Sequence, residues 1–212
     1  MVKIRFLGRS CLELITLKDH FIIDPNYLRP PTKGIENVFF TQGNMYHFDP
    51  NKLKEIQENY FENEDDEEEL EIYGPDILRE KTEFEIKKIK DGKKISFEDT
   101  EIAVFEVECE RPEQCYSYVF TIGEVRVLHT ADSALFSDRL RNFQEKIDYC
   151  FISCFEANFK DYLLFLQKIN PKVIFPFHFI EGEEEKGKKL VEYLMSNGLE
   201  SSFLDIGDEF EF

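Results

Sequence analysis

Short apolar stretches separated by turn residues dominate the first two thirds of the chain. Alternating or continuous apolar residues over a few positions are typical of β-strands that are half buried or fully buried. Turn residues such as Gly92 and Gly123 mark where one stretch ends and the next begins. The pattern predicts strands at residues 2–7, 11–17, 21–24, 36–41, 71–73, 83–89, 94–97, 101–107, 116–122 and 125–129.

Helical patterns begin after Asp49-Pro50, an N-cap residue followed by the residue best tolerated at the first helical position. Leu53, Ile56 and Tyr60 give this helix its apolar stripe. The last third of the chain then alternates between strand and helix. Strands are expected at residues 148–154, 172–177 and 202–212, and helices at 75–81, 156–169 and 183–197. Strands first and strand–helix units later predict an α/β fold with two sheets and outer helices, in one domain over residues 1–212.

The charge of the chain narrows the classes of partner. The 212 residues have a formal net charge of −18, so a nucleic acid held by phosphate contacts is not expected. Residues 62–71 hold eight carboxylates in ten positions and are expected to form a solvated loop, with metal buffering or partner binding as alternatives. No apolar run is long enough to span a bilayer and no secretory pattern is present, which predicts a cytoplasmic protein without membrane contact.

The five cysteines include no C-x-x-C pair, which fits a protein of a reducing compartment. Cys11, Cys150 and Cys154 lie in apolar stretches and are interpreted as small core residues. His20 lies beside Asp19 in a predicted turn and is expected at the surface.

Three predicted strand ends carry residues of types that commonly ligate metal ions. His47 lies in the polar loop after strand 36–41, Asp132 follows strand 125–129, and His178 follows strand 172–177. Loops at strand ends are where α/β folds place their sites. Two imidazoles and one carboxylate form an ordinary ligand set for zinc or iron, with positions left for water or substrate. The alternative for each residue is a surface or hydrogen-bonded side chain without a metal.

The order and flanks of these segments resemble the metallo-β-lactamase superfamily, and within it the small cytoplasmic metal-dependent hydrolases related to ascorbate-6-phosphate lactonase. The resemblance runs almost from end to end and implies the four-layer αβ/βα sandwich of that family. Its segments are Ile4 to Leu14, Ile22-Ile23-Asp24-Pro25, Ile89 to Phe97, Val127 to Ser133, Pro171 to His178 and Leu204 to Phe210.

The metal-binding signature departs from the family pattern. The family usually reads Thr-His-x-His-x-Asp-His where this chain reads Thr41-Gln42-Gly43-Asn44-Met45-Tyr46-His47. The stretch 107–110, where a further histidine is expected, contains none. The family's Gly-Asp is Ala131-Asp132 here, and its Gly-His near the start is Gly8-Arg9. The resemblance therefore implies that the first of two metal sites is empty and that His47, Asp132 and His178 remain from the second.

Two functions follow from this resemblance. The first is a hydrolase of a small ester, lactone or phosphodiester that uses one zinc, iron or manganese ion, with Tyr46 as a proton donor or distant ligand and Gln42 and Asn44 beside the substrate. The second is a metal-free member of the family that binds a small molecule or assembles with a partner. A nuclease is a third alternative, which the negative charge disfavours.

Cys109 and Glu108 offer a further alternative for the missing histidine, because thiolate and carboxylate groups both bind zinc. A hydrolase built on Cys109 with His47 or His129 is also conceivable, although no local signature supports it.

Overall fold

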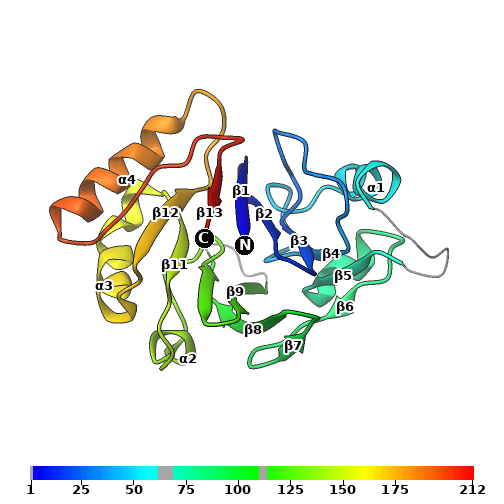
Figure 1. The fold of residues 1–212 in the computed structure, drawn as a ribbon, viewed down its shortest axis with the longest axis horizontal. Helices are drawn as coiled ribbons and strands as arrows, with labels where there is room; N and C mark the ends of the chain where they lie inside the picture. Colours follow the sequence, from blue (N-terminus) through cyan, green and yellow to red (C-terminus); the bar gives the residue numbers. More distant parts are fainter. Residues whose placement is uncertain (1, 62–68, 110–113) are drawn as a thin grey trace.

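The computed structural model describes residues 2–61, 69–109 and 114–212. Within this part of the chain, two mixed β-sheets pack face to face and helices cover their outer surfaces (Figure 1). Helix α1 lies outside the first sheet, and α2, α3 and α4 lie outside the second. The predicted α/β sandwich is confirmed.

The first sheet has the strand order β13-β1-β2-β3-β4-β5-β6. Its strands are β1 Lys3–Gly8, β2 Cys11–Ile15, β3 His20–Ile23, β4 Asn37–Phe39, β5 Glu71–Gly74, β6 Lys87–Lys88 and β13 Glu209–Glu211. Strands β3 to β6 are parallel to one another, whereas β13, β1, β2 and β3 pair in antiparallel fashion. The pairing of β1 with β13 brings the two ends of the chain together, and Val2 N donates to Phe212 O over 3.0 Å.

The second sheet has the order β12-β11-β10-β9-β8-β7. Its strands are β7 Lys94–Ser96, β8 Thr100–Val107, β9 Cys115–Ile122, β10 Val125–His129, β11 Tyr149–Ser153 and β12 Val173–Phe177. The helices are α1 Pro50–Asn59, α2 Asp138–Arg141, α3 Phe159–Ile169 and α4 Glu184–Ser196, with 3₁₀ turns at Asp76–Glu80 and Glu156–Asn158. Strands β10, β11 and β12 are parallel, so their carboxyl ends meet at one edge.

Aromatic side chains fill the space between the two sheets. Phe39 of β4 is buried there, with its ring stacked on Tyr73 at 4.7 Å and edge-on to Tyr118 at 5.4 Å between ring centroids. Such pairs add to the apolar area that each ring removes from water. A second cluster, on the outer face of the first sheet, contains Leu53 and Ile56 of α1. The two clusters hold α1 and both sheets as one layered unit.

The N-terminus of α1 is fixed by Asp49, whose side chain accepts a hydrogen bond of 2.8 Å from Asn51 N. We expect Asp49→Ala to lower the free energy of unfolding by about 1 kcal/mol, because the helix loses its capping acceptor. Chemical denaturation measures this loss. Asp49→Asn keeps an acceptor and should unfold as the unchanged protein does; an equal loss in both variants would contradict the capping role.

Four predicted features differ from the structure. Only Lys87–Lys88 of the predicted strand 83–89 pairs with a neighbour, and only Glu209–Glu211 of 202–212 does, since Gly207 turns the chain with φ 99°. The short helix α2 was not predicted. His20 is not at the surface: it is 7% exposed and its Nε2 lies 2.9 Å from Oε1 of buried Glu13. Its partner comes from the adjacent strand β2, which no local pattern reveals.

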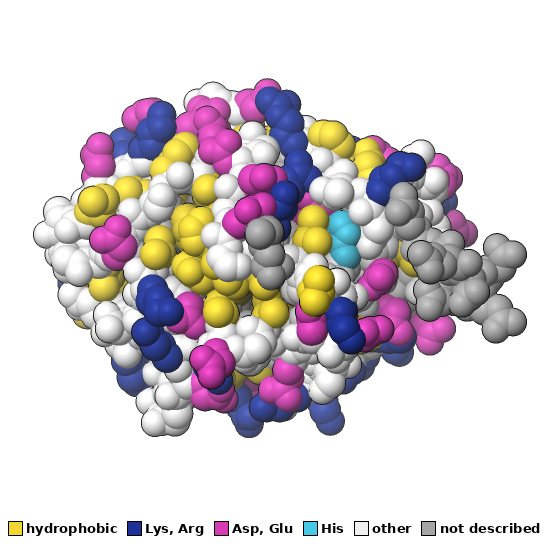
Figure 2. Space-filling model, in the orientation of Figure 1, with side chains coloured by type: hydrophobic (Ala, Val, Ile, Leu, Met, Phe, Trp, Pro, Cys, Tyr) yellow, Lys and Arg dark blue, Asp and Glu magenta, His cyan; other side chains and the backbone are white. Residues whose placement is uncertain are grey.

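The cysteine prediction is confirmed for Cys11, Cys150 and Cys154, which are buried and free. In the acidic run, residues 62–68 lie outside the described part of the chain, and Glu71 begins β5. Among the described residues, every helix is too short or too polar to cross a membrane. On the face shown in Figure 2, Lys and Arg side chains are interspersed with Asp and Glu and do not gather in one basic patch.

Candidate metal centre

The three predicted ligands come together where strand ends from both sheets meet. His47 lies in the loop between β4 and α1, Asp132 lies three residues after β10, and His178 directly follows β12. One ligand atom from each lies within 4.8 Å of the other two. Residues more than 40 positions apart in the chain thus form one cluster, as the resemblance to the family implied.

The loop that carries His47 is held by its own polar groups. Asn44 O accepts hydrogen bonds from His47 N at 3.1 Å and Phe48 N at 2.9 Å, and Asn44 Oδ1 accepts one from Tyr46 N at 2.9 Å. The Phe48 ring packs on Phe40 with centroids 5.1 Å apart. These contacts turn the His47 side chain into the protein, where it is fully buried.

His47 lies between two carboxylates. Its Nδ1 lies 2.6 Å from Asp24 Oδ2, and its Nε2 lies 2.7 Å from Asp132 Oδ2. Burial alone lowers the pKa of His47, but the charges of Asp132 and Asp24 outweigh it and raise the pKa to about 10. Asp24 also accepts hydrogen bonds from Thr41 N and Thr41 Oγ1, at 2.7 and 2.6 Å. Asp24 therefore fixes the orientation of the His47 ring and leaves Nε2 facing the other ligands.

Asp132 and His178 face each other with unsatisfied atoms. Asp132 Oδ1 and His178 Nε2 lie 3.3 Å apart, both are buried, and neither has a hydrogen-bond partner of proper alignment among the described residues. Burial raises the pKa of Asp132, but its interactions with His47 and His178 outweigh burial and hold the pKa far below its usual range. A buried carboxylate oxygen and a buried imidazole nitrogen without partners, beside a second imidazole nitrogen, fit one metal ion.

Gln42 occupies part of the space around these ligands. Its Nε2 donates to Asp132 Oδ2 over 2.9 Å and lies 2.7 Å from His47 Nε2. An amide in this position is a neutral group where the family pattern has a histidine, so it supplies a weak ligand at best. Asn44 Oδ1 is already an acceptor for Tyr46 N. That Gln42 and Asn44 hold no second ion stays a prediction.

A cavity of about 280 Å³ opens onto the cluster. Gln42, Asn44, Tyr46, Asp132 and His178 line it, together with Cys109 and Phe155. Tyr46 is 45% exposed at its rim. The Phe155 ring lies 4.8 Å from the His178 ring and gives the cavity an apolar wall.

Two residues of the site, Asp24 and Phe155, were not identified from the sequence. Asp24 ends an apolar strand and precedes Pro25, which was a signal of the resemblance but not of a contact with His47. Phe155 follows β11, and its position in the sequence indicated only an ordinary apolar residue. Neither has a sequence signature of its own, because each role depends on a partner far along the chain.

Cys109 is not a free ligand in this structure. It forms a disulfide with Cys115, which joins the end of β8 to the start of β9. The alternative in which a Cys109 thiolate replaces the missing histidine is therefore wrong for this state, and so is a Cys109-based hydrolase. Glu108 is exposed, and its backbone oxygen accepts from Ser133 Oγ at 2.7 Å. His129 is buried against Phe177, and burial lowers its pKa to about 4.

Three backbone positions at the site have the left-handed conformation that favours glycine. The φ angles are 47° at Asp24, 54° at Ala131 and 70° at His178. Such positions cost free energy and persist where the surrounding structure holds them. Ala131 keeps this conformation although the family pattern has glycine there, so the turn that presents Asp132 is retained in spite of the substitution.

Comparison with known proteins shows the family of this chain. Residues 3–178 match the family model described as a β-lactamase superfamily domain. The chain belongs to the metallo-β-lactamase superfamily. No curated protein matches the sequence.

Solved structures share the superfamily fold at low sequence identity. The metallo-β-lactamase fold protein YhfI from Bacillus subtilis is 16% identical with a TM-score of 0.78, and each chain covers 100% of the other. Igni18, a metallo hydrolase from the archaeon Ignicoccus hospitalis, is 15% identical with a TM-score of 0.76, over 100% of this chain and 99% of that one.

A third solved structure with a similar fold has a different chemistry. CmlA, a diiron β-hydroxylase from Streptomyces venezuelae, is 13% identical with a TM-score of 0.74, and the match covers 100% of this chain and 54% of CmlA. At these identities the likeness establishes the fold alone, and a fold can host several activities. The finer placement near ascorbate-6-phosphate lactonase stays a prediction.

Proposed function

We propose that this protein is a hydrolase that uses one metal ion, held by His47, Asp132 and His178. The observation that carries the proposal is the pair of buried atoms without hydrogen-bond partners, Asp132 Oδ1 and His178 Nε2, which lie 3.3 Å apart beside His47. Two imidazoles and a carboxylate suit zinc or iron, and manganese is the third candidate.

The residues around the cluster have separate roles in this proposal. A bound ion supplies Lewis acidity and lowers the pKa of a water molecule. Asp24 accepts the Nδ1 proton of His47 and so keeps Nε2 available. Gln42 and Asn44 line the cavity and offer amide groups to a substrate, and Phe155 excludes water from one wall. A cavity of about 280 Å³ suits a small ester, lactone or phosphodiester.

The test is the metal content of the protein, purified without chelator and without a histidine tag, by elemental mass spectrometry. The proposal predicts about one zinc, iron or manganese ion per chain. The same preparation is then assayed with ester, lactone and phosphodiester substrates. A metal content under about a tenth of an equivalent, even after incubation with each ion, would contradict the proposal and favour the metal-free ligand-binding protein.

Tyr46 is proposed as the proton donor at the rim of the cavity. Tyr46→Phe removes only the hydroxyl group, so we expect kcat to fall by about 10²-fold while the metal content and KM change little. The measurement is steady-state kinetics with whichever substrate the assay identifies. A variant with unchanged kcat would show that the Tyr46 hydroxyl takes no part in the reaction.

A further inference from the structure

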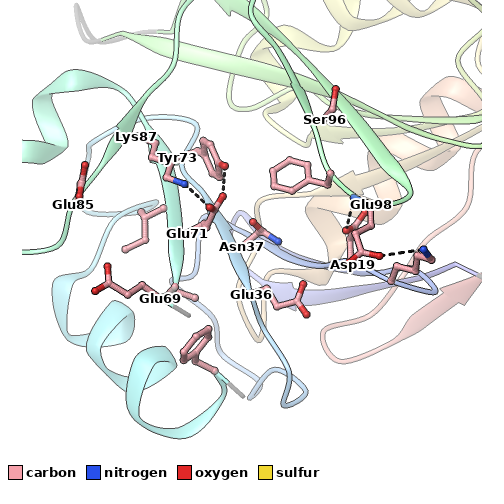
Figure 3. A pocket seen from close by; sticks show the side chains of 15 residues that line it. Asp19, Glu36, Asn37, Glu69, Glu71, Tyr73, Glu85, Lys87, Ser96 and Glu98 are labelled. Carbon is pink, nitrogen blue, oxygen red and sulfur yellow. Dashed lines mark hydrogen bonds and ion pairs between the residues drawn. The ribbon is translucent and has the colours of Figure 1, made fainter. Parts of the chain in front are cut away.

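A second, larger cavity of about 900 Å³ lies at the other end of β4 from the candidate metal centre. Asn37 is the first residue of β4, whereas the loop with His47 follows the last. The cavity forms where β4 and β5 of the first sheet face Ser96 and Phe97 at the end of β7 in the second (Figure 3). It shares no lining residue with the cavity at the metal centre.

Asn37 is the feature that sets this cavity apart from an ordinary surface hollow. It lies on the same face of β4 as Phe39, the face that packs between the sheets, because side chains two positions apart point to the same side. Asn37 is only 4% exposed, yet no hydrogen bond joins its side-chain amide to another described residue. Figure 3 shows this amide directed into the cavity. An amide that faces a cavity without a protein partner offers one acceptor oxygen and two N–H donors to a ligand that enters it.

The charges around the cavity indicate the sign of that ligand. Six carboxylates and two ammonium groups line it. Both ammonium groups are already paired, Lys18 with Glu98 at 3.1 Å and Lys87 with Glu71. Glu69 and Glu85 have no ion pair with any described residue. In Figure 3, Glu69 and Glu85 lie on one side of the cavity and Asp19 and Glu98 on the other, with Asn37 between them.

Aromatic and aliphatic groups line the same space. Phe61, Tyr73 and Phe97 contribute rings, and Leu70 and Ile72 contribute aliphatic side chains. A bare metal ion would use the carboxylates and leave this apolar surface without a function. An aliphatic chain with ammonium groups at its ends matches both, since methylene groups pack on rings and ammonium groups are attracted to ring faces and carboxylates.

We propose that this cavity binds a linear aliphatic polyamine, with the ammonium groups at the carboxylates of its two sides and Asn37 Oδ1 accepting a hydrogen bond from one amine. The separation from the metal centre makes this a site additional to the proposed hydrolase site. Its existence does not depend on whether the metal ion is present.

Isothermal titration calorimetry with spermidine at 0.15 M salt tests the proposal, since that salt concentration screens diffuse attraction to an acidic protein. We expect saturable binding of one spermidine per chain. Asn37→Leu, which replaces the amide with an apolar group of similar size, should weaken binding by about tenfold. The double variant Glu69→Gln/Glu85→Gln should weaken it by about the same factor and keeps the proposal testable if Asn37→Leu does not fold.

The matched control is Glu192→Gln/Glu200→Gln, which removes two exposed carboxylates outside the cavity and changes the net charge equally. It should bind spermidine within about twofold of the unchanged protein. Equal weakening in the control and the cavity variants would overturn the proposal in favour of diffuse charge attraction. Binding of Mg²⁺ or Ca²⁺ with no saturable spermidine binding would overturn it in favour of a simple cation site.

Discussion

His178→Ala is expected to reduce the metal content from about one ion to under about a tenth of an equivalent per chain, and to abolish hydrolysis. The variant removes one of three proposed ligands and leaves His47 and Asp132, too few to hold an ion tightly at this site. His178 is the best ligand to change, because its side chain is 16% exposed whereas that of His47 is fully buried. Elemental mass spectrometry measures the metal, and circular dichroism checks the fold.

Tyr46→Phe is the matched control for this variant. Tyr46 lines the same cavity but lies outside the set of three ligands, so its metal content should equal that of the unchanged protein. If His178→Ala keeps a full equivalent of metal, the proposed ligand set is wrong. Equal loss in both variants would mean that the cavity, rather than the His178 imidazole, determines metal retention.

Asp24→Ala is expected to lower the free energy of unfolding by about 3–5 kcal/mol, because one partner of a buried charge pair is lost. Asp24 Oδ2 lies 2.6 Å from His47 Nδ1, and both side chains are fully buried. The variant also leaves Thr41 N and Thr41 Oγ1 without their acceptor. Chemical denaturation in the presence of a chelator gives the change in stability without the contribution of a bound ion.

Asp24→Asn distinguishes the charge of this residue from its shape. The amide fills the same volume and keeps an acceptor oxygen for Thr41 N, so stability should fall less than in Asp24→Ala. The metal affinity should still fall by about 10- to 100-fold, since the group that orients His47 has lost its charge. A change of less than about 1 kcal/mol in Asp24→Ala would show that the His47 ring is held by packing alone.

Local signals in the sequence predicted much of the fold. Asp49-Pro50 marked the start of α1, and Leu53 and Ile56 proved to be its buried residues. These signals work because capping and helical spacing involve residues within one or two turns of each other. The prediction was wrong for most of 202–212, where apolar residues pack on the core without pairing as a strand. Whether an apolar segment pairs or only packs depends on a neighbouring strand far along the chain.

The three ligands of the candidate site were also predicted from the sequence, whereas their contacts with other side chains were not. His47, Asp132 and His178 were identified because each follows a predicted strand, and the structure brings them within 4.8 Å of one another. Tyr46, Gln42 and Asn44 line the cavity beside these three residues. Their participation in catalysis or substrate binding stays a prediction.

The sequence by itself determined the order of strands and helices, the α/β class and the residue types at three strand ends, because these follow from spacing along a single segment. Only the tertiary structure decided which side chains meet. Gln42 contacts Asp132 across 90 positions of the chain, and Asp24 contacts His47 across 23. The cavity around Asn37 likewise forms from both sheets. Contacts of this kind depend on how the two sheets pack, and the spacing of residues along the chain does not predict that packing.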